Sequence, residues 1–252
     1  RFDKSLVPYF SVPALSHATR PEIPPPEVFC TRMSELNNRL DASYHVPVAK
    51  TAKKLLYHGN YKPSKLSNLV RSPGDIFVPP RFKRVYVQSS YGIPLLQGAH
   101  ISQMKPYGLK YLSRTQQRGI ARWLVRKGWI LVTCSGTIGR VGLVSSYQHE
   151  WAASQHLLRI IPDYSKGHPG YIAAFLMTPY GQHQLASKIY GGVVDELTAE
   201  DTREILIPDS PLDIQKAIGE RVVRAFEKKD EATAIEEEAI RQLEIVLQSA
   251  TP

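Results

Sequence analysis

The sequence predicts a mixed α/β (α+β) domain followed by one long C-terminal helix of coiled-coil type. Between residues 65 and 161, short β-rich runs alternate with Gly and Pro, which is typical of an irregular sheet. From residue 212 to 248, apolar residues recur at the spacing of a long amphipathic helix. Because the chain has 252 residues and 42% of them are apolar, it can bury a substantial core, which excludes general disorder.

The N-terminal part of the chain predicts a connector and one short helix. Six prolines before residue 27 indicate an extended segment, because Pro fixes φ and removes a backbone donor. Apolar groups at helical spacing over residues 46–58, with Gly59 as a stop, predict a helix. We divide the chain into a Pro-rich connector at 1–30, a domain at 31–210 and a helical arm at 211–252.

The domain is expected to contain short strands and two helical pieces. Gly136 and Gly139 are best explained by a tight turn between two strands. Helical pieces over 171–177 and 180–188 are expected to lie on the sheet. The expected strands are the runs 75–78, 85–88, 129–134, 141–145 and 156–161.

The formal net charge of +9 is unevenly distributed along the chain. Residues 195–252 contain 15 acidic and 7 basic residues, whereas residues 1–194 contain 25 basic and 8 acidic ones. Between Asp75 and Glu150 there is no acid, although 11 bases occur. Such a one-sign surface repels itself, so it indicates a polyanionic partner, and nucleic acid is the natural one. A basic surface without a specific partner is the alternative interpretation.

The basic segment predicts a DNA-binding surface. Phosphate contacts are expected mostly from Lys and Arg, and base contacts from Arg, Gln and Tyr within residues 81–126. Trp123 is interpreted as core packing rather than base stacking. The candidate DNA-binding residues, which include two hydroxyls of the glycine turn, are Arg81, Lys83, Arg84, Gln97, Lys105, Lys110, Arg114, Gln116, Arg118, Arg122, Ser135, Thr137 and Arg140.

The long helix needs a partner for its apolar stripe. A second copy of the chain, another part of a longer protein or a different protein could supply a second helix. We prefer these partners to a helix folded back on its own domain, because the domain looks complete before the helix begins. The candidate helix-pairing residues are Ile214, Ile218, Val222, Ala225, Ile235, Ala239 and Leu243.

Motifs that resemble catalytic or metal sites are incomplete in this sequence. Residues 78–81 read Val-Pro-Pro-Arg, which fails the polar-Pro-Pro-aromatic pattern of a DNA methyltransferase. Residues 208–209 with 227–229 imitate a nuclease pattern, but the second half lies in the long helix. His149-Glu150 lacks the second His of a zinc protease, and residues 136–139 lack the Lys of a P-loop. We therefore expect no catalytic residue, no metal and no bound cofactor.

Cysteine usage and hydropathy place the chain in a reducing, aqueous compartment. Cys30 and Cys134 are too few for a disulfide framework. A transmembrane run of about 18 apolar residues and a signal-peptide layout are both absent from the sequence. We expect a cytoplasmic protein without a membrane partner. Because it opens at Arg1 without Met, the chain is expected to be a fragment or one half of something longer.

Several segments resemble a known family in the order in which they occur. Residues 131–144 resemble the strand-turn-strand of target recognition domains in type I restriction-modification specificity subunits. Residues 208–218 resemble the proline-bearing junction that leads into the spacer helix of that family. Three further segments that resemble the family are 39–45, 93–101 and 151–161.

The resemblance implies a non-catalytic DNA specificity module that acts in defence against foreign DNA. In that family one subunit carries two recognition domains, which read the halves of a split DNA sequence, and two long antiparallel helices that dock methyltransferase subunits. This chain has one domain and one helix, so it resembles a half-subunit that forms a homodimer or pairs with a second half. The implied partners are double-stranded DNA, a DNA methyltransferase subunit that binds S-adenosylmethionine, and a restriction subunit.

Two other functions stay open from the sequence. The chain could be the recognition domain of a fused modification or nuclease enzyme. It could also be a helical scaffold protein whose basic surface binds RNA.

Overall fold

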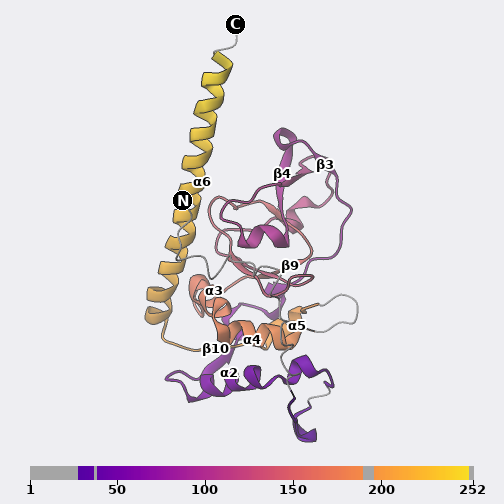
Figure 1. Cartoon of the computed structure of the whole chain (residues 1–252), viewed down its shortest axis with the longest axis vertical. Coiled ribbons are helices and arrows are strands. Elements are labelled where there is room, and N and C mark those ends of the chain that lie inside the picture. The colour runs from indigo at the N-terminus through magenta and orange to yellow at the C-terminus, as the bar shows by residue number, and fades with distance from the viewer. Residues whose placement is uncertain (1–27, 37–38, 190–195, 250–252) are drawn as a thin grey trace, which may run out of the picture.

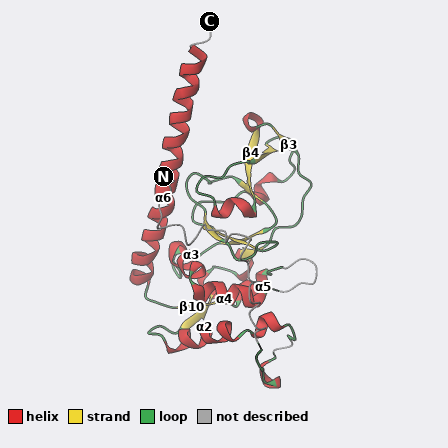
Figure 2. Ribbon diagram, in the orientation of Figure 1, coloured by secondary structure: helices red, strands yellow, loops and turns green. Residues whose placement is uncertain are grey.

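The computed structural model describes residues 28–36, 39–189 and 196–249, which form stacked layers with one long helix along their side (Figure 1). In this view a helical layer lies at the bottom, a buried sheet in the middle and a second sheet at the top. Figure 2 shows the same layers by secondary structure. The predicted connector lies almost entirely outside the described residues.

The helical layer begins with two 3₁₀ turns, η3 (Met33–Glu35) and η4 (Ala42–His45), and continues into helix α2 (Pro47–His58). Pro47 starts α2 because proline is compatible with the first helical turn. Ala49, Ala52 and Leu56 form its buried face, which packs against α4 (Pro179–Lys188). The predicted helix is therefore confirmed.

A two-stranded antiparallel sheet joins distant parts of this layer. Strand β1 (Pro63–Lys65) pairs with β10 (Leu206–Pro208), with Ser64 opposite Ile207. The 3₁₀ turn η5 (Leu66–Leu69) follows β1 and buries Leu66 and Leu69. This pairing brings the end of the domain back to its beginning, directly before the long helix.

The central sheet is antiparallel and has the order β2-β9-β6-β7, formed by Ile76–Phe77, Leu157–Ile160, Ile130–Thr133 and Val141–Leu143. A 3₁₀ turn, η6 (Pro73–Asp75), precedes it. Strands β6 and β9 are buried along their length and form the main core with helix α3 (Pro169–Met177). Between β6 and β7, Gly136 and Gly139 have φ of 75° and 88°, so the predicted glycine turn is confirmed.

The upper sheet has the order β3-β5-β4-β8, formed by Tyr86–Val87, Lys110–Ser113, Gly92–Leu96 and Ala152–Ala153. Strands β4 and β8 are parallel, and the other pairs are antiparallel. The 3₁₀ turns η7 (Ser89–Tyr91), η8 (Gly98–Ser102) and η9 (Ile120–Trp123) connect or flank its strands. Trp123 is buried and stacks on Phe82 at a ring distance of 4.0 Å, as its interpretation as core packing required.

The expectation of one irregular sheet is wrong, because the described residues form three sheets. The five predicted strands were placed correctly, but they are divided between the central and the upper sheet. Helices α3 and α4 and a short helix α5 (Ala199–Arg203) complete the domain. Thr178 and Thr198 cap α4 and α5, because each hydroxyl accepts a bond from a first-turn N–H group.

Helix α6 (Leu212–Ser249) has 38 residues, which corresponds to about 57 Å. Its first turns pack closely on α3, where Gly219 and Gly170 allow the two backbones to approach. Val223 and Phe226 then pack against the main core. Asp230 accepts hydrogen bonds from the Ser145 hydroxyl at 2.7 Å and from a neighbouring backbone N–H group.

Acidic residues continue this contact along α6. Glu237 Oε1 accepts a bond from the Tyr147 hydroxyl at 2.9 Å. Lys105 Nζ lies 3.2 Å from Glu236 and 3.5 Å from Glu237. The preference for a helix that does not fold back on its domain is therefore wrong for residues up to Glu237. The predicted helix-pairing residues did not include the residues that make these contacts with the domain, which are Gly219, Val223, Phe226, Asp230, Glu236 and Glu237.

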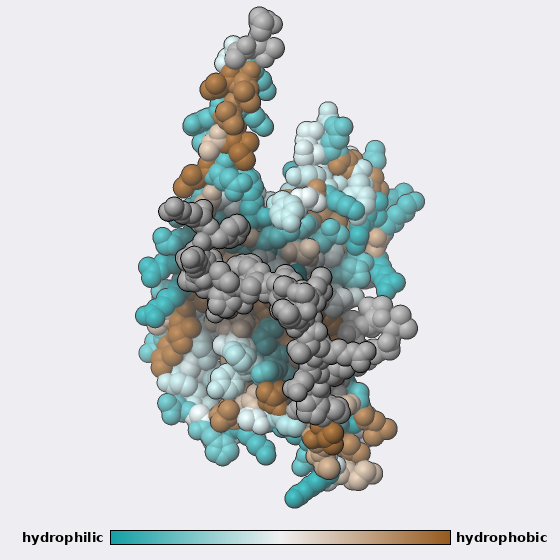
Figure 3. Space-filling view, in the orientation of Figure 1, coloured by the Kyte–Doolittle hydropathy of each residue, from teal (hydrophilic) through white to brown (hydrophobic). Residues whose placement is uncertain are grey.

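Beyond Glu237 every described residue of α6 is exposed. Figure 3 shows apolar side chains, in brown, along this end with polar ones, in teal, beside them, and the end stands clear of the upper sheet. Of the predicted pairing residues, Ile235 and Leu243 are 71% and 59% exposed, and Ile218 is 41% exposed. Ala225 and Ala239 are also exposed, whereas Ile214 and Val222 are half-buried. Among the described residues, no helix is both long and apolar enough to cross a membrane.

Candidate nucleic-acid interface

The upper sheet and its loops form a lobe whose charges are all positive. We call residues 81–126 the basic lobe, since they contain nine Arg and Lys residues and no Asp or Glu. This middle part of the acid-free segment thus folds into one continuous part of the molecule, which Figure 1 shows around β3 and β4. A concentration of one charge on one lobe favours contact with a polyanion.

Most cations of the basic lobe are directed to solvent. For the seven exposed ones, the described residues supply no carboxylate within ion-pair distance. Their charge is therefore not neutralised by a neighbouring acid, which leaves it available to phosphate groups. These residues are Arg81, Lys83, Lys110, Arg114, Arg118, Arg122 and Arg126.

Besides Arg84, three predicted DNA-binding residues have partners within the fold. Lys105 contacts the acids of α6, so it belongs to the contact between the lobe and the helix. Gln97 is half-buried at the start of η8, where its backbone N–H group donates to His100 Nδ1 at 3.1 Å. Arg140 is exposed, and its Nη1 donates to Ser102 Oγ at 3.2 Å.

Of the other candidates, Gln116 belongs to the lobe, whereas Ser135 and Thr137 lie between β6 and β7, outside it. Gln116 and Thr137 are exposed, and Ser135 is half-buried. The backbone carbonyl of Thr137 accepts a 2.6 Å bond from the Thr133 hydroxyl, which fixes the glycine turn while leaving the Thr137 side chain outside. Gln117, next to the exposed Gln116, is buried and donates to the Lys83 carbonyl at 3.0 Å, so it stabilises the lobe.

An open groove with aromatic walls follows the free edge of the upper sheet. Strand β3 pairs only with β5 among the described strands, and Tyr86 at this edge is 45% exposed. Lys110 Nζ lies 5.4 Å from the centre of the Tyr86 ring. Gln88, Ser89 and Tyr111 also line the groove. Basic, aromatic and amide groups therefore lie together on one surface.

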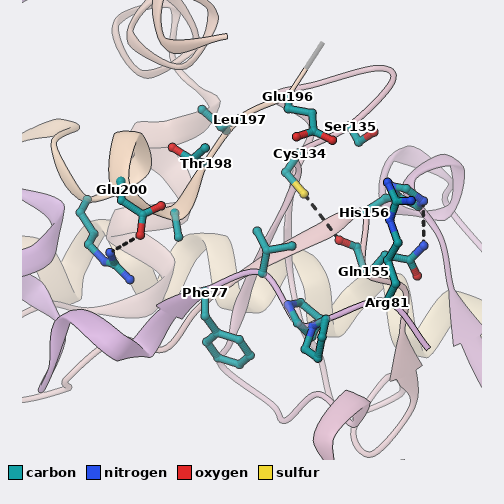
Figure 4. A pocket seen from close by; sticks show the side chains of 15 residues that line it. Phe77, Arg81, Cys134, Ser135, Gln155, His156, Glu196, Leu197, Thr198 and Glu200 are labelled. Carbon is teal, nitrogen blue, oxygen red and sulfur yellow. Dashed lines mark hydrogen bonds and ion pairs between the residues drawn. The ribbon is translucent and has the colours of Figure 1, made fainter. Parts of the chain in front are cut away.

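A cleft of about 490 Å³ lies where the basic lobe meets the central sheet and α5 (Figure 4). Phe77, Pro79 and Pro80 give it an apolar side. Arg81 and Ser135 come from the predicted set, and Glu196 belongs to the wall beside α5.

Gln155 and His156 were not in the predicted set, but they lie in this cleft beside Arg81 (Figure 4). Gln155 Oε1 accepts a 2.7 Å hydrogen bond from Arg84 Nη2, and its Nε2 lies 3.0 Å from His156 Nε2. Burial lowers the pKa of His156 below its usual value, and the charges of Arg84 and Arg81 lower it further. The imidazole is therefore neutral near pH 7. The polar run 154–156, which lies between strand β8 and strand β9, was the local signal for these residues.

Cys134 lines the same cleft, but burial raises the pKa of its thiol to about 11. The thiol is therefore protonated near pH 7 and is a poor nucleophile. The described residues contain no group of three or more His, Cys, Asp or Glu side chains that could hold a metal ion.

A family model described as the type I restriction modification DNA specificity domain matches residues 92–244, which is more than half of the chain. None of the curated protein sequences matches this chain. The matched residues include most of the basic lobe, the cleft loop that carries Gln155 and most of α6.

Solved structures with a similar fold have low sequence identity to this chain. One of them comes from a study of complex assembly and conformational transition in the type I R-M system. Its TM-score is 0.51 at 15% sequence identity, and the match covers 82% of this chain and 50% of that one. It supports the predicted fold class. The HsdS subunit from Thermoanaerobacter tengcongensis gives a TM-score of 0.46 at 15% identity, over 79% and 46% of the two chains.

A third structure is the type I restriction-modification system S subunit from M. genitalium, with a TM-score of 0.42 at 17% identity over 73% of this chain and 44% of that one. The chain therefore spans about half the length of the solved structures that it matches.

Proposed function

Because this chain belongs to the family of type I restriction modification DNA specificity domains, we propose that it selects the DNA sequence on which a partner methyltransferase acts. The family is non-catalytic, in agreement with the expectation that the chain is not itself an enzyme. The observation that carries the proposal is the basic lobe, whose exposed cations have no acidic neighbour among the described residues. Such a surface supplies the phosphate contacts, and its Arg, Gln and Tyr groups the base contacts.

The exposed end of α6 supports a second element of the proposal, which is pairing with another helix. Ile235, Ala239, Leu243 and Val246 follow one another at helical spacing and are all exposed. A stripe of this kind is stabilised when a second long helix covers it. Since the chain spans about half of the structure from the type I R-M system that it matches, the second helix would come from a second copy, a second half-subunit or another part of a longer protein.

The remaining partners follow from the same proposal. A DNA methyltransferase subunit binds S-adenosylmethionine and performs the reaction, and a restriction subunit joins the same complex. The chain itself needs no cofactor for sequence selection. Because the proposed role requires contact with DNA and with these subunits, we expect the chain to act in the cytoplasm.

Selection from a pool of randomised DNA duplexes tests the proposed function. The full chain, alone and with a methyltransferase of the same system, is incubated with the pool, and the bound duplexes are sequenced. We expect one short motif, or two motifs at fixed spacing when two helices pair. A pool that shows no enrichment contradicts the proposal, as does stronger binding to a duplex RNA competitor than to the enriched DNA.

A further inference from the structure

Arg84 and Gln155 form a polar pair that links the basic lobe to the connection between β8 and β9. The two residues are 71 positions apart, and Arg84 Nη2 donates to Gln155 Oε1 at 2.7 Å. Arg84 Nη1 also donates to the Tyr86 hydroxyl at 3.3 Å. These two bonds orient the guanidinium between the aromatic groove and the cleft.

The guanidinium of Arg84 keeps donors that the fold does not use. No carboxylate of the described residues lies within ion-pair distance of it, and its Nε is buried without a hydrogen-bond partner. The guanidinium of Arg84 carries more N–H groups than its two hydrogen bonds, to Tyr86 and Gln155, occupy. An oriented arginine that is not neutralised by an acid is suited to a ligand with two neighbouring acceptors.

The loop that carries Gln155 is held from below by a buried cation. Arg159 is almost fully buried, and its guanidinium donates to the carbonyl groups of Ser154 at 2.7 Å, Ala153 at 2.5 Å and Leu157. These bonds cross from the upper to the central sheet, so they fix the backbone on both sides of Gln155. Gln155 is thereby a rigid support for Arg84.

We propose that Arg84, positioned by Gln155, reads a guanine of the target DNA through the N7 and O6 acceptors of its major-groove edge. This inference rests on the proposed function and assigns one base of the recognised sequence to one side chain. Arginine is the usual partner of guanine, because its planar donors match both acceptors at once. Arg81 at the mouth of the cleft then lies next to the read base, where it contacts the backbone phosphate.

Four variants of the full chain test the assignment by selection from the randomised pool. Arg84→Lys keeps the positive charge but loses the planar pair of donors, whereas Arg84→Ala loses both. Gln155→Ala keeps Arg84 and removes its support. Arg122→Ala is the matched control, because Arg122 is an exposed arginine of the same lobe. Thermal unfolding of each variant shows whether it is folded.

We expect the wild type to prefer guanine at one position by roughly ten- to hundredfold, and Arg84→Lys and Arg84→Ala to lose that preference alone. Gln155→Ala should weaken the preference at the same position, at unchanged affinity for non-target DNA. Arg122→Ala, which removes a proposed phosphate contact, should weaken binding to all duplexes about equally and keep the whole motif. Two results would show that Arg84 is a phosphate contact and that the inference is wrong. One is an Arg84→Lys variant that keeps the wild-type motif, and the other is an Arg84→Ala variant in which the base preference weakens equally at all positions. A wild type that enriches no motif contradicts the proposed function itself.

Discussion

Replacing Gly219 by Ala tests the contact between α6 and its own domain. In an isolated helix this change stabilises by about 1 kcal/mol, because Gly is a poor helix former. In the docked helix the added Cβ would lie 2.8 Å from Cγ and 2.6 Å from Cε1 of the His168 ring, closer than real Cβ contacts allow. The ring cannot move freely, because its Nδ1 accepts a 3.2 Å bond from the Gly170 N–H group.

The two effects have opposite signs, so their balance distinguishes the docked helix from a free one. Overpacking at a close contact costs about 1–3 kcal/mol, and several atoms would be displaced here, so we expect a net loss of about 2 kcal/mol. For a chain of this size that lowers the melting temperature by roughly 4–8 °C.

Thermal unfolding followed by circular dichroism measures this change. Gly74→Ala is the matched control, because the nearest atom to its added Cβ is the Ser72 hydroxyl at 3.6 Å and its φ is not left-handed. The control should leave the melting temperature unchanged or raise it slightly. A higher melting temperature for Gly219→Ala would refute the docking of α6 on α3.

Three further predictions concern the same fold. Asp230→Ala should lower the free energy of unfolding in urea by about 1–3 kcal/mol, because two donors lose their acceptor. The control Glu231→Ala, at an exposed position of the same helix, should change this free energy by less than about 0.5 kcal/mol. Leu243→Lys should leave the melting temperature of the isolated chain unchanged but abolish helix pairing in sedimentation, whereas Glu244→Lys should preserve pairing. Burial holds the pKa of His100, His156 and His168 below 6.5, so the unfolded state binds more protons than the folded state. The free energy of unfolding should therefore fall as the pH drops below about 6.5. A urea midpoint that stays constant or rises when the pH is lowered from about 7.5 to about 5.5 would contradict this prediction.

Elements with strong local patterns could be predicted from the sequence. The 38-residue helix α6 repeats its apolar spacing many times, and the β6–β7 turn has two glycines at positions with positive φ. Strands β1, β8 and β10 have only two or three residues each, and their formation depends on partners far away in the chain. No local pattern could indicate them.

The candidate site was predictable to a similar extent. The acid-free run indicated the basic lobe, because charge composition is visible without the fold. The pairing of Arg84 with Gln155 depends on a contact across 71 residues, so Gln155 could not be selected from the sequence. The sequence also could not show that Lys105 contacts α6 instead of solvent, because its acidic neighbours lie more than a hundred residues later in the chain.

The salt dependence of duplex binding tests the central claim most directly. The affinity of the full chain for its enriched duplex is measured over a range of salt concentrations, for the wild type and for the Arg114→Ala/Arg118→Ala double variant. If the basic lobe holds the DNA phosphates, affinity falls steeply with salt, and the double variant binds more weakly with a logarithmic slope that is smaller by about two. Unchanged affinity and an unchanged slope in the double variant would contradict the assignment of this surface to DNA.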